Sequence, residues 1–491
     1  MLRLAAGGLI HCGKRRNVLD AGQYFKAASL TVQAGEPLEE AKVLDGDDVL
    51  LEFDEMAKYT KDHLSSKPSY IHEYYRPKNQ SFARKTPQEV EDWVTEWESI
   101  KLAWDACAQT AIDCDRLEIR TIAAIINRCK TGGYCNNSLL LDLVTKILGD
   151  HALNRFTIIQ ISMIVQSLGM LARDARDEEE GERNLFNKHV VVNHGEESGS
   201  PTAETAVDFF TNTCCKFTAA LLEDFVQQGI IPSKCTVRDL SSITHGLGLQ
   251  FPHELMLKDL SSDVEDWAAA FGLEFRKKAR YPTCLPIDYS NILHGLANLQ
   301  CKKSVNGICW LLERSLEGRD FEQQAITNIV WSLGKLNMGS QVVFDRLGKH
   351  ITLTVKTFIN QGLSNTVYGL GLRYRDGGIS LERTVLRVLA DEIIKQHRIR
   401  AFNSQDFFSI VYGFGLLGFR DGDVVDALVS EINRRVRQRR ERRERAKEKR
   451  ANDEQGKDGG SVENDADEED IEDDDVWPEH QMIIMQHALG R

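Results

Sequence analysis

The sequence has 491 residues, of which 42% are hydrophobic and 27% charged, and its formal net charge is −13. This composition is that of a globular protein with enough apolar residues for a large core, and no apolar run approaches the roughly 18 residues of a membrane span. An acidic chain does not bind nucleic acid through its overall charge, so any such role must rest on local patches. Because no apolar run is long enough to span a membrane, we expect no membrane association.

The first nineteen residues, 1–19, contain four basic residues and no acidic residue. Their spacing of Leu, Ala and Ile is compatible with a basic amphipathic helix, which is typical of a mitochondrial presequence. Gly7 and Gly8, and the absence of serine before Ser29, depart from that pattern, so a disordered N-terminus is the alternative. We expect a mitochondrial protein, with the plastid, or the cytoplasm if 1–19 is no presequence, as alternatives.

After this segment, residues 20–86 are polar and irregular, and we interpret them as a linker. Helical patterning begins at 87–118, and we expect residues 87–438 to form one α-helical domain. Within it, a segment rich in Arg, Asp, Glu, Gly and Ser predicts a disordered insertion at about 173–202.

A short motif recurs seven times in this domain. The two successive spacings of 37 residues set the length of the unit, and the longer spacings indicate insertions in loops. The seven copies are IAAIINRCKTG from Ile122, ISMIVQSLGML from Ile161, LSSITHGLGLQ from Leu240, YSNILHGLANL from Tyr289, ITNIVWSLGKL from Ile326, LSNTVYGLGLR from Leu363 and FFSIVYGFGLL from Phe407.

In most copies of this motif, which we call helix A, apolar residues fall at positions 1, 4, 8 and 11, the period of one helical face. Positions 7 and 9 are mostly Gly, Ser or Ala, and this recurrence predicts close approach between helices, because glycine inside a helix costs about 1 kcal/mol. A second amphipathic helix follows each copy, for example at 342–359. A pair of helices cannot bury both its faces alone, so the sequence predicts an all-α fold, an α-solenoid of two-helix repeats of about 37 residues.

Positions 6 and 3 of helix A lie off the core face and are the candidates for function. Position 6 can stack on or hydrogen-bond a base of single-stranded RNA, or it can pack against the next repeat. The asparagine at position 3 can bind a base edge or tie two repeats together. The candidate residues are His245, His294, Trp331, Tyr368 and Tyr412 at position 6, and Asn291, Asn328 and Asn365 at position 3.

A basic run, 434–450, continues the last helix and holds eleven Lys and Arg against three Glu. It could contact RNA phosphates through Arg439, Arg440, Arg442 and Arg443, or it could be a solvated charged helix that the following residues neutralise. Those residues, 451–491, form a predicted acidic disordered tail with a short apolar end, MIIM at 482–485.

The motif at 289–299 and 326–336 resembles helix A of octotricopeptide-type repeats and their relatives in algal, apicomplexan and kinetoplastid organelles. These relatives include RAP-domain proteins, FAST-kinase-like proteins and helical-repeat subunits of the mitochondrial RNA-editing substrate-binding complex. The resemblance covers about 122–438 and implies an organellar RNA-binding or RNA-processing factor without enzymatic activity. A RAP-like module is not evident, because the charged helix and acidic tail occupy its place.

No pattern in the sequence predicts catalysis, a metal or a cofactor. The eleven cysteines form no C-x-x-C pair, which argues against a zinc site, and no phosphate-binding, zinc-protease or serine-esterase motif is present. The expected partners are single-stranded RNA of an organellar transcript, protein subunits of a ribonucleoprotein complex, or both. An RNA-binding protein in RNA processing, editing, stability or translation is the first hypothesis, and a scaffold that binds only proteins is the second.

Overall fold

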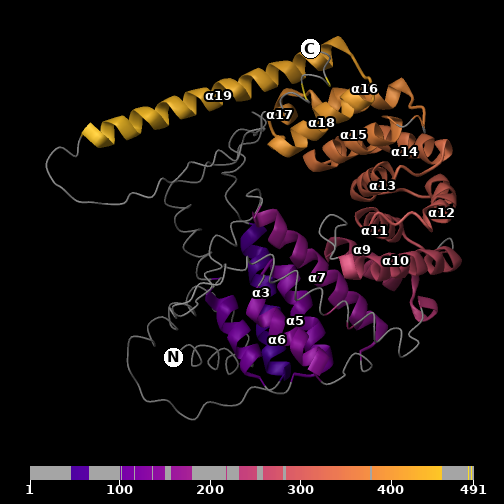
Figure 1. The fold of residues 1–491 in the computed structure, drawn as a ribbon, viewed down its shortest axis with the longest axis vertical. Helices are drawn as coiled ribbons and strands as arrows, with labels where there is room; N and C mark the ends of the chain where they lie inside the picture. Colours follow the sequence, from indigo (N-terminus) through magenta and orange to yellow (C-terminus); the bar gives the residue numbers. More distant parts are fainter. Residues whose placement is uncertain are drawn as a thin grey trace. The chain divides into compact units, whose positions relative to one another are not determined.

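The structure is a computed structural model of the chain, and every regular element in the part that it describes is a helix (Figure 1). The prediction of an all-α fold is confirmed. The residues described are 46–65, 100, 102–114, 117–134, 136–149, 156–179, 217, 220, 232–250, 258–279, 283–375, 377, 379–455, 485 and 488. The chain forms two compact units, one from 1–69 with 82–284 and the other from 70–81 with 285–491.

The first unit is built on successive contacts between α3 and α5, α5 and α7, and α7 and α9. Helices α6 and α10 pack against α5 and α9 respectively. The helices are α3 (Gly46–Ser65), α5 (Ile119–Gly132), α6 (Asn137–Gly149), α7 (Ile158–Glu179), the 3-10 turn η3 (Pro232–Lys234), α9 (Val237–Gln250) and α10 (Lys258–Lys278), together with helical residues 102–113.

The tryptophan at 104 is the centre of the packing between α3, the helical residues 102–113 and α5. Trp104 is fully buried, its Nε1 donates to Thr60 Oγ1 at 2.9 Å, and its ring stacks on Tyr134 at 4.8 Å between centroids. Phe53 of α3 meets the same ring edge-on at 5.6 Å. One buried aromatic group with a satisfied N–H thus joins three segments far apart in sequence.

The second unit consists of two layers of helices (Figure 1). One layer is formed by contacts of α11 with α13, α13 with α15 and α15 with α18, and the other by contacts of α12 with α14 and α14 with α16. The helices are α11 (Pro286–Asn298), α12 (Val305–Gly318), α13 (Gln323–Leu336), α14 (Gln341–Thr354), the 3-10 turn η5 (Val355–Thr357), α15 (Asn360–Arg375), α16 (Arg383–Ile393), α17 (Gln396–Ile399), α18 (Ser404–Leu416) and α19 (Gly422–Gln455).

Every copy of helix A is one of these helices: α5, α7 and α9 in the first unit, and α11, α13, α15 and α18 in the second. The residues at positions 1, 4 and 8 are buried in all seven copies, as the periodicity predicts. Position 5 is also buried throughout, for example Val330, Val367 and Val411 at 0% exposure. A helix A is therefore covered on a wider arc than one apolar stripe, because it has another helix A on at least one side.

Glycines at positions 7 and 9 set the approach of one helix A to the next. A Cβ added at Gly334, position 9 of α13, would lie 2.7 Å from the Cα of Gly369, position 7 of α15. The same pairing of position 9 with position 7 joins Gly371 to Gly413 in the second unit and Gly169 to Gly246 in the first. The neighbouring atoms are backbone, which cannot move aside, so the small residues are required by contact between main chains.

Three segments differ from expectation. Helix α3 lies inside the stretch 20–86 that we interpret from the sequence as linker, so 46–65 is helical instead of irregular. Helix α7 runs to Glu179, into the predicted disordered insertion, and α19 runs to Gln455, past the predicted start of the tail. Residues 485 and 488 within that tail are also helical. The predicted presequence, residues 1–19, lies outside the described residues.

Candidate nucleic-acid interface

Four of the candidate rings lie at position 6 on consecutive helices of one layer in the second unit. His294 is on α11, Trp331 on α13, Tyr368 on α15 and Tyr412 on α18, and all four are half-buried. Because α11, α13, α15 and α18 contact one another in this order, equivalent positions fall in a row across the layer. The structure thus brings these four predicted site residues into one ring row, the name used below for His294, Trp331, Tyr368 and Tyr412.

Neighbouring rings of this row contact each other in pairs. His294 stacks on Trp331 with centroids 5.1 Å apart and an interplanar angle of 28°, and Tyr368 lies 6.1 Å from Tyr412 at 37°. Phe408 of α18 stacks on Tyr412 at 5.9 Å, nearly parallel. The rings therefore pack against the adjacent helix A, and the exposed part of each ring is what a ligand could reach.

A positive charge lies beside the tryptophan of the row. Lys335 Nζ sits 5.0 Å from the centroid of the Trp331 ring, one turn along the same helix. On the neighbouring helix α11, Asn298 Nδ2 lies 3.4 Å from His294 Nδ1, one turn further along that helix. Trp331 thus has both a cation and a stacked ring within reach, a combination that suits the face of a base and the phosphate next to it.

The fifth candidate ring, His245, lies on α9 in the first unit and does not belong to the ring row. Burial, with a smaller contribution from the positive charge of Arg173, lowers the pKa of His245 to about 4. The imidazole is therefore neutral at physiological pH. It offers no charge to a phosphate.

The asparagines at position 3 have different surroundings. Asn328 Nδ2 donates to Ser290 Oγ on the preceding helix A at 3.2 Å, so this asparagine ties α13 to α11. Asn291 is buried with 7% exposure, whereas Asn365 is half-buried. Asn328 thus has the second of the two roles expected at this position, and burial leaves little of Asn291 for a ligand to reach.

A polar link between helices was not found from the sequence. Ser364 Oγ, at position 2 of α15, donates to Asp406 Oδ1, one residue before position 1 of α18, at 2.7 Å. In the first unit, Ser162 of α7 makes the equivalent bond to Asp239 of α9 at 3.3 Å. The sequence contains a pattern that could have revealed this link. One copy has an Asp directly before its position 1, and the copy before it has a Ser at position 2.

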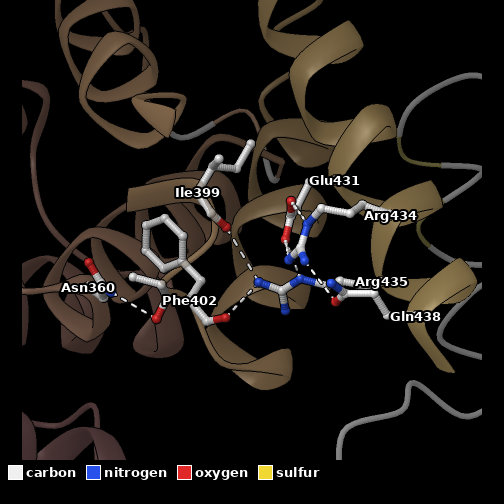
Figure 2. A network of polar contacts seen from close by, with 8 residues as sticks. Asn360, Ile399, Phe402, Glu431, Arg434, Arg435 and Gln438 are labelled. Atoms are coloured by element: carbon white, nitrogen blue, oxygen red, sulfur yellow. Dashed lines mark hydrogen bonds and ion pairs between the residues drawn. The ribbon is translucent and has the colours of Figure 1, made fainter. Parts of the chain in front are cut away.

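The base of α19 is fixed to the second unit by arginines (Figure 2). Arg435 donates to Glu431 at 2.8 Å and to the carbonyl oxygen of Phe402 at 2.7 Å, with a longer bond of 3.4 Å to that of Ile399. Arg434 also binds the Glu431 carboxylate, at 2.5 Å. Burial tends to raise the pKa of Glu431, but the two arginines outweigh it and hold that pKa below its ordinary value.

Beyond this anchor, α19 carries the four candidate arginines of the basic run. Arg440 is exposed, and Arg439, Arg442 and Arg443 lie on the same helix, although their side chains are outside the described residues. Arg445 is also exposed and lies 3.9 Å from Glu441. Where the structure describes it, this part of α19 thus presents charge to solvent.

The described residues offer little for other chemistry. They hold no group of three or more His, Cys, Asp or Glu side chains that could bind a metal, and none of their helices is long and apolar enough to cross a membrane. Burial raises the pKa of Cys107 and Cys309 to about 12 and that of Cys235 to about 11. These three thiols are therefore not ionised at neutral pH, which makes them poor nucleophiles and poor metal ligands.

Comparison of the chain with protein-family models and with curated protein sequences gives no match.

Proposed function

We propose that the chain is an α-solenoid of about 37-residue, two-helix repeats that binds single-stranded RNA and acts in RNA processing, editing, stability or translation within an organelle, with the mitochondrion as the first candidate. The observation that supports this function best is the ring row. It repeats one aromatic or imidazole side chain at the same position of four successive helices, and Lys335 lies beside Trp331.

Stacking suits this arrangement because every base has a π-face, so that a row of rings can hold a strand with little sequence preference. Hydrogen bonds from His294 and from the two tyrosine hydroxyls would add discrimination between bases. The basic part of α19 would add phosphate contacts, and these make the affinity depend on salt.

The test is binding of the full-length chain to labelled single-stranded RNA of mixed sequence at fixed salt. Trp331→Ala removes a ring of the row, and we expect it to weaken binding about 5- to 100-fold, the range for loss of one stacked base. The matched control is Trp310→Ala, which removes an exposed tryptophan of α12, in the other layer. Affinity that stays unchanged in Trp331→Ala, or that falls equally in both variants, would contradict the proposed role of the row.

A protein-binding scaffold in a mitochondrial ribonucleoprotein complex is the second candidate. It is favoured by exposed apolar side chains in the second unit, which include Trp310 at 52%, Leu353 at 82% and Ile359 at 58% exposure. Crosslinking in the native organelle separates the two functions. Enrichment of RNA on the chain supports the first, whereas stable recovery of protein subunits without RNA supports the second.

A further inference from the structure

Gly415, near the end of α18, makes the same kind of contact that position 9 makes in earlier copies of helix A. In three pairs, position 9 of one helix A meets position 7 of the next, as for Gly371 and Gly413. Gly415 is position 9 of the seventh copy. A Cβ added to it would lie 2.5 Å from the Cβ and 2.9 Å from the Cα of Ala488. Ala488 therefore occupies the place that position 7 of a following helix A would take.

The sequence around Ala488 fits the motif in the register that this contact dictates. When Ala488 is set to position 7, residues 482–491, MIIMQHALGR, fill positions 1 to 10. Apolar residues then fall at positions 1, 4 and 8, small residues at 7 and 9, and a ring at position 6, where His487 stands. Three residues depart from the motif. Ile483 and Ile484 stand at positions 2 and 3, which are Ser, Thr or Asn in most other copies, and Gln486 stands at position 5, which is apolar in six of the seven copies. The register comes from a contact in space, so the match of the residue types is an independent observation.

Burial agrees with the same register. Met485 is helical and 1% exposed, and it falls at position 4, where Ile329 and Ile410 of earlier copies are fully buried. Ala488 is helical as well. Both described residues of this segment thus have the backbone and the contacts of a helix A.

We propose that residues 482–490 are helix A of an eighth repeat, and that this segment of the chain itself covers the face of α18 on which Gly415 lies. Helix α19 is then the second helix of the seventh repeat, and the acidic stretch 453–475 is an insertion between two elements of the array. The occupant of the α18 face is therefore internal, and a ligand that needs this face has to displace it.

Hydrogen exchange on the full-length chain tests this docking. In the wild type we expect the amides of 485–490 to exchange at least about tenfold more slowly than in an unstructured peptide, because docked helices are protected. Gly415→Leu places a side chain against Ala488, and we expect the protection to be lost. The matched control, Gly422→Leu, changes a glycine whose Cβ would meet nothing within 4 Å, and the protection should remain.

Because Gly415→Leu could also disturb α18 itself, a second variant is needed. Ala488→Leu enlarges the other partner of the contact and leaves α18 unchanged, and we expect the same loss for 485–490 with normal protection of α13 and α15. Wild-type amides of 485–490 that exchange at the unstructured rate would overturn the proposal. So would protection that survives both substitutions.

One consequence rests on the proposed function. His487 takes position 6 of the eighth copy, so it would add a fifth side chain to the ring row. In the RNA-binding assay we expect His487→Ala to weaken binding severalfold, while hydrogen exchange of 485–490 stays unchanged. Normal exchange with unchanged affinity would refute RNA contact by His487 and leave the docking intact, so the two ideas can fail separately.

Discussion

A Cβ placed on Gly369 would lie 2.7 Å from the carbonyl oxygen of Val330, on the preceding helix A. The Cα of Trp331 would be almost as near, at 2.8 Å. Both atoms belong to the backbone of α13, so the contact between α13 and α15 depends on the absence of a side chain at this point.

We expect Gly369→Ala to destabilise the second unit by about 1 to 3 kcal/mol, the usual cost of forcing extra volume into a packed site. The higher helix propensity of alanine, worth about 1 kcal/mol, acts in the opposite direction and is outweighed by the collision. Thermal and urea unfolding measure the difference. Gly422→Ala is the control, and it should be neutral or slightly stabilising because its Cβ meets nothing. Equal stability of both variants would show that α15 can move away from α13 at little cost.

A second prediction concerns a buried acid in the first unit. Glu52 of α3 is 6% exposed, and burial, with the nearby charges of Asp48 and Glu55, raises its pKa to about 7 from 4.5. The folded state therefore favours the protonated form. Stability from this group is full below pH 4.5 and is lost as the pH rises through 7.

We expect Glu52→Gln to stabilise the chain by about 3 kcal/mol at pH 8 and to give little benefit at pH 4.5, because the pKa rises from 4.5 to about 7 and one pKa unit corresponds to about 1.4 kcal/mol. Urea unfolding at the two pH values gives the comparison. The control is Asp47→Asn, an exposed acid of the same helix that is not among the causes of the raised pKa of Glu52, and a small effect with little dependence on pH is expected. A gain at pH 4.5 as large as the gain at pH 8 would mean that the charge of Glu52 is not the cause.

A third prediction has the opposite sign. The pKa of His245 is lowered to about 4 by burial and by Arg173, so the folded state disfavours the protonated ring. The stability that depends on a neutral His245 is complete above pH 6.5 and is lost as the pH falls toward 4.

His245→Gln should therefore make the first unit less sensitive to acid, with a smaller loss of stability between pH 7 and pH 4.5 than in the wild type. Position 6 of the second copy is Gln166, so glutamine is already used at this position. The comparison variant is His397→Gln, which changes an exposed histidine of the second unit. If acid sensitivity is reduced equally in both variants, burial of His245 is not responsible.

A fourth prediction tests the anchor of α19. Arg435→Ala removes the donor to the carbonyl oxygens of Phe402 and Ile399 and leaves the buried Glu431 with Arg434 alone. Loss of one partner of a buried ion pair usually costs about 3 kcal/mol. We expect faster hydrogen exchange in residues 424–436, with α13 and α15 unaffected. Arg440→Ala removes an exposed arginine of the same helix and should leave this exchange as it is.

The sequence predicts the helices of the repeats well, because its apolar positions have a period that only a helix satisfies. Positions 1, 4 and 8 are buried in every copy, as expected. Position 5 could not be recognised as core from a single helix, since its burial comes from the helix alongside. Helix α3 was missed because acidic and lysine residues fill its exposed face, although Val49, Phe53 and Met56 face the core.

The candidate site was predictable as a set of equivalent positions but not as a set of contacts. The repeat places His294, Trp331, Tyr368 and Tyr412 at one register, and the structure puts them on successive helices of one layer. Which rings touch depends on the rotation and spacing of the helices, and the motif does not contain these quantities. For the same reason, the sequence does not reveal two further contacts. One is the hydrogen bond between Ser364 and Asp406, 42 residues apart, and the other is the contact between Gly415 and Ala488, 73 residues apart.

Arg435 fixes α19 to the second unit, and most of the basic part of this helix lies beyond that point. A helix advances about 1.5 Å per residue, so the twenty residues from Val436 to Gln455 extend about 30 Å along the helix axis. Since Arg435 is bonded to the main-chain oxygens of Ile399 and Phe402, at the end of α17 and just after it, α19 is held in place at this point. A molecule bound near the C-terminal end of α19 would therefore be kept at a fixed distance from one bound on α13. In that case α19 would act as a spacer between the two.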